Sequence, residues 1–328
     1  VSALGDSRIE NIASMRRAGV PAPMTLIRSP MLSQAHLVVA HAAVSFNTEL
    51  DVFSKLSCAA RDRNCQHGVV LRIELGDLRE GIMPGELEDT VRQVLHFPNI
   101  TLKGIGTNLA CRSGVSPDAG NMSELSALAT SIEASFGVPL ATVSGGNSAN
   151  LAWALSDADT RRINDLRLGE SILLGRETLH RTPIDGLHTD AITLVAEVIE
   201  SKVKPSRPWG EIAQTAFGEK PPAADRGDIL QMILAIGHQD TDPCGLHVPP
   251  GMEVLGHSSD HLVAESGPTH LSVGAEVRFQ LNYSALVRAM TSPYVAKVIR
   301  GQSNAGTHSF VDRLPSTRFG VRRSRPSG

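Results

Sequence analysis

The chain has 328 residues, of which 41% are hydrophobic and 20% charged, and its formal net charge is −3. This is an ordinary globular composition, long enough for one large domain or two of medium size. The near-neutral charge gives no electrostatic reason to expect nucleic-acid or membrane-surface binding, and no apolar run reaches the roughly 18 residues of a membrane span. The four cysteines form no CxxC pair, which favours a reducing, cytoplasmic compartment over a disulfide framework.

The first 186 residues alternate short apolar runs with longer amphipathic runs. The short runs predict strands at residues 1–5, 24–28, 43–47, 69–75, 102–108, 140–147 and 165–171. The amphipathic runs predict helices at 7–19, 48–63, 84–97, 121–137 and 151–163. Such alternation is typical of βαβ units around a parallel sheet.

Seven strands are one fewer than a closed (β/α)8 barrel needs. A doubly wound open sheet would suit seven strands, but no GxGxxG or GxxxxGK[ST] motif occurs where a nucleotide-binding sheet places it. We therefore predict an α/β fold, with a TIM-type (β/α)8 barrel over residues 1–186 that lacks its first strand.

After residue 186 the pattern changes to short β-like runs separated by Gly, Pro and Asp turns, with no long helix expected. Residues 187–300 predict a second, mainly antiparallel β domain. Residues 301–328 lack apolar periodicity and carry five arginines and one acidic residue, so we predict a disordered Arg-rich tail. A basic tail can grip nucleic acid or phosphate, but a solvated extension without a role is the better expectation.

Four predicted strand ends carry polar or glycine residues, and carboxyl strand ends are where a barrel places its chemistry. In chain order these residues are Arg79, Thr107, Asn108, Asn147, Ser148, Arg167, Gly169 and Glu170. Arg167 is notable because it interrupts an apolar run, and arginine is rarely buried without a partner. A glycine-rich turn beside a late barrel strand can hold a phosphate through amides and hydroxyls. A tight turn that merely needs glycine is the alternative for residues 144–148.

Six segments together resemble one family. They are LGDSRIENI (4–12), LGDLREGI (75–82), GIGTNLAC (104–111), SGGNS (144–148), RLGESILLGRE (167–177) and NYSALVRAMTSPYV (282–295). The resemblance is to the alanine/ornithine racemase family, pyridoxal-phosphate enzymes of fold type III. It implies a barrel with a C-terminal β domain, pyridoxal 5′-phosphate as cofactor, and a homodimer whose active sites lie at the subunit interface.

The resemblance also implies residue roles. Arg167 resembles the arginine that donates to the pyridine nitrogen; since a guanidinium keeps its proton, the ring nitrogen stays unprotonated and the ring is a weaker electron sink. That favours returning a proton to Cα, as racemisation requires. Arg79 resembles the arginine near the phenolic oxygen and the substrate carboxylate, with a surface-turn arginine as the alternative. The residues that resemble phosphate ligands are Asn147, Ser148, the backbone of Gly169 and Glu170, and Tyr283, for which a core tyrosine is the alternative.

The chain departs from the family pattern at the Schiff-base lysine, which the family carries at the end of the first barrel strand. No lysine precedes Lys55, which falls in a predicted helix, and Lys103 lies towards the amino end of its strand. Neither is expected to reach the cofactor, and without that amine the chain as given should be inactive. We expect the missing strand and the missing lysine to belong to one segment ahead of Val1.

A second departure concerns the base on the opposite face of the substrate. Alanine racemases use a tyrosine in a GYxDG-like turn, and the matching turn here, GHQDT (237–241), has His238 in that position. A histidine can take the proton role near neutral pH, although a surface-turn histidine explains it equally well. Ser259, Asp260 and His261 resemble the second interface loop of the β domain, where acidic groups would suit a basic substrate such as ornithine.

A metal site is the rival interpretation of the same turn. Its ligands would be His238, Asp240, Cys244 and His247, but their spacing matches no standard zinc pattern, and we expect no metal.

These features predict a pyridoxal-phosphate-dependent amino-acid racemase of the alanine or ornithine type, with Arg79 and His238 as catalytic residues. The alternative is a non-catalytic pyridoxal-phosphate-binding protein of cofactor homeostasis that has dispensed with the lysine. The sequence leaves open which amino acid is turned over.

Overall fold

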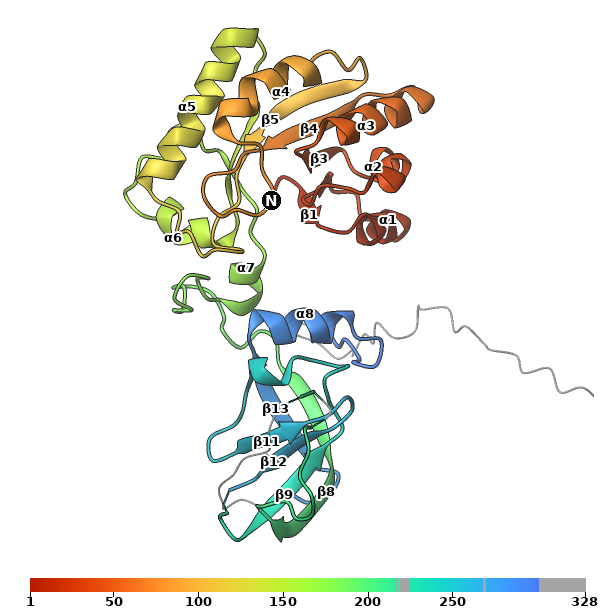
Figure 1. Ribbon diagram of the computed structural model, residues 1–328, viewed down its shortest axis with the longest axis vertical. Helices are drawn as coiled ribbons and strands as arrows, with labels where there is room; N and C mark the ends of the chain where they lie inside the picture. Colours follow the sequence, from red (N-terminus) through yellow and green to blue (C-terminus); the bar gives the residue numbers. More distant parts are fainter. Residues whose placement is uncertain (216, 219–224, 268–269, 301–328) are drawn as a thin grey trace, which may run out of the picture. The chain divides into compact units, whose positions relative to one another are not determined.

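The computed structural model describes residues 1–215, 217–218, 225–267 and 270–300, and the predicted tail at 301–328 lies outside these residues. The chain divides into two compact units, residues 1–189 and 190–328 (Figure 1). All four cysteines are free thiols. Among the described residues, no helix is both long and apolar enough to cross a membrane.

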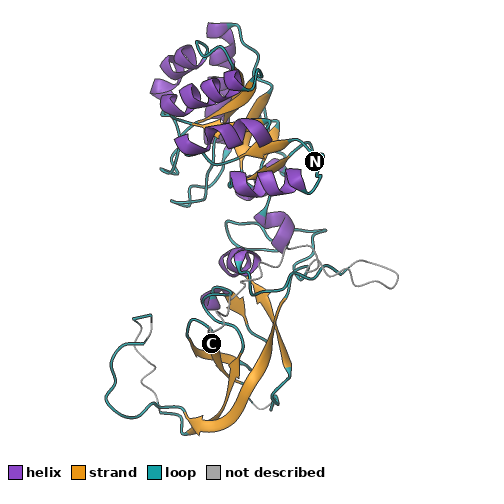
Figure 2. Ribbon diagram, turned by 90° about the vertical axis from the view of Figure 1, so that its right-hand side faces the viewer, coloured by secondary structure: helices purple, strands orange, loops and turns teal. Residues whose placement is uncertain are grey.

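The first unit is built on a parallel sheet whose seven strands pair in chain order. The strands are β1 Leu4–Asp6, β2 Met24–Leu26, β3 Val44–Asn47, β4 His67–Arg72, β5 Ile100–Gly106, β6 Thr142–Gly146 and β7 Asp165–Leu166. The sheet curls, with the helices along its outer face (Figures 1 and 2). The prediction of parallel, barrel-type α/β structure is confirmed.

Seven α-helices accompany these strands in the described part of the unit. They are α1 Ile9–Arg17, α2 Ala35–His41, α3 Leu50–Asp62, α4 Leu87–Val94, α5 Ala119–Phe136, α6 Leu151–Ala154 and α7 Glu170–Leu174. The prediction missed α2, and the helix predicted at 151–163 stops after four residues. Its continuation fails because Ser156 and Asp159 bond amides two residues ahead, at 3.2 and 2.9 Å, which competes with helical bonding. The strand predicted at 165–171 is also too long, since α7 begins at Glu170.

Alternation along β4 decides which side chains line the inside of the sheet. Val69, Leu71 and Ile73 belong to the hydrophobic core shared with the helices. Because successive strand residues point to opposite faces, Val70 and Arg72 point to the inside. β4 therefore carries a buried arginine into the interior at its carboxyl end.

The second unit is an antiparallel sheet of six strands in the order β10-β13-β8-β9-β12-β11, which confirms the predicted β architecture. Its elements are β8 Leu194–Pro205, β9 Asp228–Leu234, β10 Leu246–His247, β11 Glu253–His257, β12 Leu262–Glu265, β13 Glu276–Leu281 and α8 Tyr283–Thr291.

Helix α8 corrects one prediction, because residues 275–290 were assigned to a single β-like run. Asn282 caps this helix by accepting a hydrogen bond from the Ala285 amide at 2.9 Å. Leu286 and Ala289 then fall on one buried face at helical spacing.

Candidate active site

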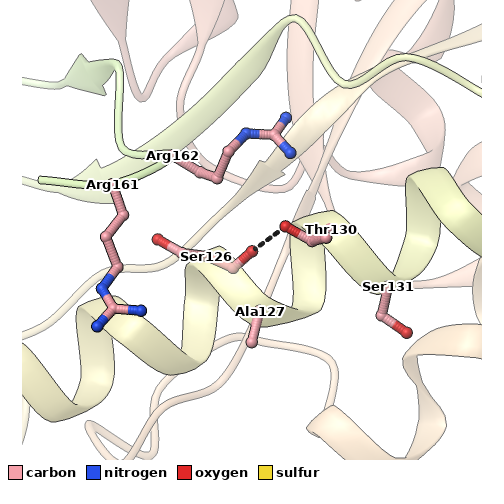
Figure 3. A pocket seen from close by; sticks show the side chains of 6 residues that line it. All are labelled: Ser126, Ala127, Thr130, Ser131, Arg161 and Arg162. Carbon is pink, nitrogen blue, oxygen red and sulfur yellow. Dashed lines mark hydrogen bonds between the residues drawn. The ribbon is translucent and has the colours of Figure 1, made fainter.

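An open surface pocket of about 480 Å³ in the first unit holds no candidate chemistry (Figure 3). Its lining is Ser126, Ala127, Thr130, Ser131, Arg161 and Arg162. Both arginines precede β7, so the pocket lies towards the amino end of the sheet. Arg162 is bound by Glu133 through two hydrogen bonds, at 2.8 and 2.9 Å. The pocket therefore offers little uncommitted polar chemistry.

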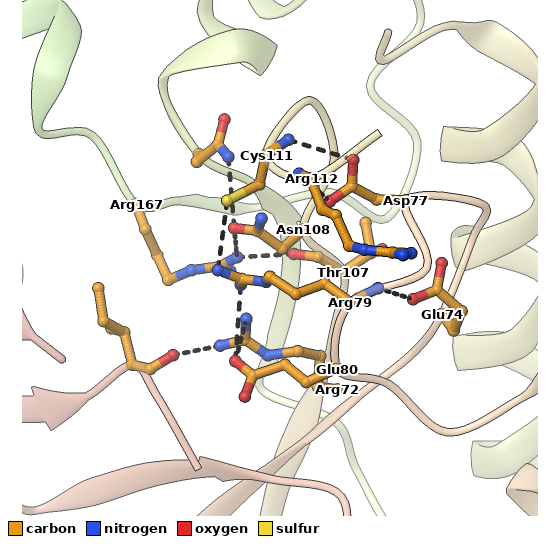
Figure 4. A network of polar contacts seen from close by, with 12 residues as sticks. Arg72, Glu74, Asp77, Arg79, Glu80, Thr107, Asn108, Cys111, Arg112 and Arg167 are labelled. Atoms are coloured by element: carbon orange, nitrogen blue, oxygen red, sulfur yellow. Dashed lines mark hydrogen bonds and ion pairs between the residues drawn. The ribbon is translucent and has the colours of Figure 1, made fainter. Parts of the chain in front are cut away.

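The carboxyl ends of β4 to β7 and the loops after them form what we call the mouth of the first unit, where Arg79, Thr107, Asn108 and Arg167 lie together (Figure 4). Arg167 lies at its centre. Its Nη2 donates to the Thr107 carbonyl at 2.6 Å and faces Asn108 Oδ1 at 3.4 Å, while Nη1 donates to the Ser144 hydroxyl. The guanidinium also lies over the Phe46 ring, 4.7 Å from its centroid. Arg167, which interrupts a buried apolar run, is thus bound by a main-chain carbonyl, a hydroxyl and an aromatic ring, and its guanidinium points into the mouth.

Charged side chains of both signs surround Arg167 at the mouth. Burial lowers the pKa of Arg167 to about 9, and Arg72 and Arg79 act in the same direction, while Asp165 and Glu80 oppose them. The guanidinium still carries its proton at neutral pH. Around Arg167 the guanidiniums of Arg72 and Arg79 are opposed by the carboxylates of Glu80 and Asp165, and Asp77 lies close enough to Arg79 to act on it.

Arg79 lies in the loop after β4, where a buried carboxylate fixes the main chain. Glu74 accepts hydrogen bonds from the amides of Gly76, Leu78 and Arg79 at 2.7, 2.9 and 3.2 Å. Leu78 adopts φ +53°, which is costly for a side chain of its size. The bonds to Glu74 offset this cost and set the point from which the Arg79 side chain departs.

Asp77 fixes the neighbouring loop. Its buried carboxylate accepts from the amides of Cys111, Arg112 and Ser113 at 2.9–3.1 Å. Burial alone would raise the pKa of Asp77, but these three amides, together with the charge of Arg79, bring it below its usual value. Asp77 is thus ionised at neutral pH and joins the loops after β4 and β5.

Asn147 and Ser148 connect the later strand ends. Asn147 Nδ2 donates to the Leu109 carbonyl at 2.8 Å. Ser148 Oγ accepts from the amides of Gly169 and Ser171, each at 3.2 Å. The structure therefore brings the loops after β6 and β7 together, as a shared ligand site requires.

The turn after β6 needs its glycine. Gly146 has φ +145°, and a Cβ there would lie 2.1 Å from the Asn150 side-chain oxygen.

Glu170, in the next loop, pairs its carboxylate with Arg181. A ligand role for Glu170 through its backbone stays a prediction.

Among the residues of the mouth that were not predicted are Arg72 and Glu80. Arg72 has a side chain that is only 1% exposed, and its Nη1 lies 2.8 Å from Glu80 Oε1. Its sequence signal resembles that of Arg167, since Arg72 interrupts the apolar run VVLRIEL. Glu80 has no such signal, because only the fold shows that it faces two arginines.

His238 lies in the second unit and is held by α8. Arg288 donates from Nη1 to the His238 carbonyl at 3.0 Å and also to the ring Nδ1. The rings of Phe217 and His257 lie 4.6 and 5.0 Å from the His238 ring, between centroids. Because Nδ1 accepts a hydrogen bond, the proton of the neutral ring is assigned to Nε2.

The predicted interface loop packs against the turn that holds His238. The amides of His238 and Gln239 donate to the carbonyls of Ser258 and Ser259 at 2.9 and 3.0 Å. Asp260 is exposed and accepts from the Gln239 side chain at 3.1 Å. The loop 258–261, which includes His261, and the turn 237–241 thus form one surface of the second unit.

Tyr283 is the first residue of α8, and its side chain is 45% exposed. The core-tyrosine alternative is therefore wrong, and its predicted phosphate role stays a prediction. Among the described residues, no group of three or more His, Cys, Asp or Glu is arranged to hold a metal ion, so the rival site of His238, Asp240, Cys244 and His247 finds no support.

The lysines of residues 1–189 are Lys55 and Lys103. Lys55 is exposed on α3. Lys103 is also exposed, and its stem passes beside Gly68 at the amino end of β4. Neither supplies an amine at the mouth.

Comparison with known proteins identifies the family. The family model described as alanine racemase, N-terminal domain, matches residues 1–176. The chain is 39% identical over 301 residues to ornithine racemase from Acetoanaerobium sticklandii, covering 90% of this chain and 85% of the relative. It is 37% identical over 301 residues to lysine racemase from Thermotoga maritima, covering 91% and 84%.

Solved structures agree on the fold. Alanine racemase from Clostridium difficile 630 aligns with a TM-score of 0.66 at 17% identity, over 91% of this chain and 81% of that one. D-threonine aldolase from Filomicrobium marinum aligns with a TM-score of 0.64 at 14% identity, over 87% and 74%. The fold therefore accommodates more than one reaction, and the sequence matches carry the assignment: as the motifs predicted, this chain belongs to the alanine racemase family.

Proposed function

We propose that this protein is a pyridoxal-phosphate-dependent racemase of amino acids with a basic side chain, ornithine or lysine. The observation that carries the proposal is the 37–39% identity to an ornithine and a lysine racemase over 301 residues. That length includes both the mouth of the first unit and the turn of His238.

The residues at the mouth fit the cofactor. Two buried donors there, Arg72 Nε and Asn108 Nδ2, have no hydrogen-bond partner among the described residues, and buried donors are costly unless a ligand or water satisfies them. Arg167 adds a cation suited to an aromatic nitrogen acceptor. The Ser148 hydroxyl and the Glu170 amide at the start of α7 add donors suited to a phosphate.

Each candidate residue then has a defined task. When bound, pyridoxal 5′-phosphate supplies an electron-withdrawing ring that acidifies the Cα–H of an amino acid. Arg167 holds the ring nitrogen, and the loop of Asn147 and Ser148, the backbone of Gly169 and Glu170, and Tyr283 hold the phosphate. Arg79 binds the substrate carboxylate. His238 would lie at one face of Cα, where Nε2 is the ring nitrogen that Arg288 does not occupy and so the one that could exchange a proton with the substrate.

The surface beside His238 supports the proposal of a basic substrate. Asp260 presents an exposed carboxylate on loop 258–261, and a terminal ammonium group is a natural partner for it. Ornithine and lysine carry such a group, whereas alanine does not. We further propose that the protein acts as a homodimer in the cytoplasm.

The non-catalytic alternative is not favoured, because both curated relatives are racemases. Lys55 and Lys103 lie away from the mouth, where the reaction needs an amine. Activity is assayed on the full-length protein in the presence of pyridoxal 5′-phosphate. Chiral chromatography after incubation with L-ornithine, L-lysine and L-alanine measures D-enantiomer formation. We expect kcat/KM for ornithine or lysine to exceed that for alanine at least about 10-fold, as one charged contact provides. No racemisation of any of the three, with cofactor bound, would refute the proposal.

A further inference from the structure

A chain of charges at the mouth runs from the interior to the surface (Figure 4). Arg72 ends β4 with a side chain that is 1% exposed, and it donates to the Ile27 carbonyl and pairs with Glu80 at 2.8 Å. Burial lowers the pKa of Arg72 to about 10, and Glu80 opposes this shift. Arg72 is thus a protonated, internally anchored cation that fixes the carboxylate of Glu80.

The same oxygen of Glu80 faces a second arginine. Arg79 Nη2 lies 3.5 Å from Glu80 Oε1, and Arg79 Nη1 lies 3.3 Å from the sulfur of Cys111. A thiol sulfur is a weak acceptor, and 3.5 Å is long for a charge-assisted bond. The guanidinium of Arg79 is therefore directed by Glu80 but not saturated by it.

We propose that Glu80 is a positioning residue for Arg79: anchored by Arg72, it holds the Arg79 guanidinium over the mouth, where Arg79 takes the carboxylate of the amino acid. The role of Arg79 rests on the proposed function, whereas the hold of Glu80 on Arg79 does not.

The charges explain why a carboxylate is needed at this position. Arg72, Arg79 and Arg167 are close enough to influence one another electrostatically, with Glu80 and Asp165 as the opposing charges. Without Glu80, two buried cations would repel Arg79. Arg79 has a side chain that is 38% exposed, so it would turn outward to solvent, which is its lowest-cost escape.

The first experiment tests the hold itself and needs no cofactor. The rate at which phenylglyoxal modifies Arg79 is measured by mass spectrometry of the peptide that contains it. Glu80→Gln should speed modification about 3- to 10-fold, as expected for the loss of one charged contact, and Glu80→Asp should restore part of the wild-type rate. Glu88→Gln is the matched control, because it removes an exposed glutamate that pairs with Arg92 at 3.0 Å. An unchanged rate in Glu80→Gln would overturn the proposal.

The second experiment tests the purpose of that hold, on the full-length protein. Glu80→Gln should raise KM for L-ornithine about 10-fold with a smaller change in kcat, because carboxylate binding is lost. In an Arg79→Gln background the same substitution should have no further effect on KM. A faster modification rate with an unchanged KM would refute the substrate role. If the wild type shows no racemisation, the proposed function fails while the modification rate still tests Glu80.

The Glu80→Asp variant guards against misfolding. Should Glu80→Gln unfold because Arg72 is left unpaired, Glu80→Asp provides the same two measurements with the charge retained. Its shorter side chain should give intermediate values of both, and wild-type values of both would contradict the proposal.

Discussion

In the first unit, main-chain donors and buried carboxylates fix the charged side chains at the strand ends, whereas in the second unit His238 lies on a turn and one arginine of α8 holds it. Glu74 and Asp77 together accept six backbone hydrogen bonds in the two loops around Arg79. His238 has hydrogen bonds from Arg288 and ring contacts with Phe217 and His257. Buried carboxylates thus fix the loops that carry the charged side chains of the first unit. In the second unit, His238 lies on a turn where its contacts can change with little effect on the fold.

We therefore expect substitutions of buried titratable residues in the first unit to change the free energy of unfolding and its pH dependence. Substitution of Arg288 in the second unit should change mainly the tautomer of the His238 ring.

The largest stability effect should come from His67 in β4. Burial lowers its pKa to about 4, so the unfolded chain binds a proton between pH 6.5 and 4 that the folded chain does not. His67 therefore leaves the free energy of unfolding unchanged above pH 6.5. As the pH falls from 6.5 towards 4, it lowers that free energy by up to about 3 kcal/mol. His67→Gln should flatten the free energy of unfolding over this interval, as measured by urea denaturation at several pH values.

The exposed His96 supplies the control for this titration. His96→Gln keeps His67 in place, so it should retain the slope that His67 produces between pH 6.5 and 4. A His67→Gln variant with the wild-type slope between pH 6.5 and 4 would show that His67 is not the group responsible.

Asp77→Asn should have the next largest effect. An amide offers one oxygen where the carboxylate offers two, so at least one of the three amides at 111–113 loses its acceptor, at a cost of about 1–3 kcal/mol. Since the pKa of Asp77 is lowered, its contribution is present above the usual carboxyl pKa and is lost as pH falls through the lowered value. The variant should therefore be less stable at pH 7, and its stability should fall less on acidification. Thermal denaturation at pH 7 and at acidic pH measures both effects. Equal stability at pH 7 would contradict this role.

Arg288→Gln should have the smallest effect on stability, below about 0.5 kcal/mol, as is usual for exposed positions. Its effect should be local: without the bond from Arg288, the His238 ring loses its reason to keep Nδ1 unprotonated. Nitrogen NMR of the imidazole should then show a larger share of the Nδ1–H tautomer. A tautomer ratio unchanged from the wild type would mean that Arg288 does not set it.

The same contrast explains what the sequence could predict. Strands of a parallel sheet are buried on both faces and give continuous apolar runs, so all seven strands of the first unit were located. Arg167 could be singled out because it interrupts such a run. Helix α8 was missed because its nine residues follow a strand directly, and periodicity separates the two poorly over short lengths.

Glu80 could not be predicted for a different reason. Its role depends on Arg72, eight residues earlier on a strand, and on the loop geometry set by Glu74. Glu80 contacts Arg72 and Arg79 because the sheet curls and the carboxylates of the two loops fix the main chain. No spacing in the sequence predicts such a contact. Tertiary contacts, not local pattern, make this part of the site.

In the proposed function, Arg167 anchors an anionic aromatic cofactor at the mouth. Equilibrium dialysis that measures the affinity for pyridoxal 5′-phosphate tests this role most directly. We predict saturable binding of one molecule per chain, weakened about 10-fold or more in Arg167→Lys and about 100-fold in Arg167→Leu, since a buried charged partner contributes several kcal/mol. Arg162→Lys, in the surface pocket, should bind as the wild type does. Binding by Arg167→Leu as tight as by the wild type, or no binding by the wild type, would contradict the account.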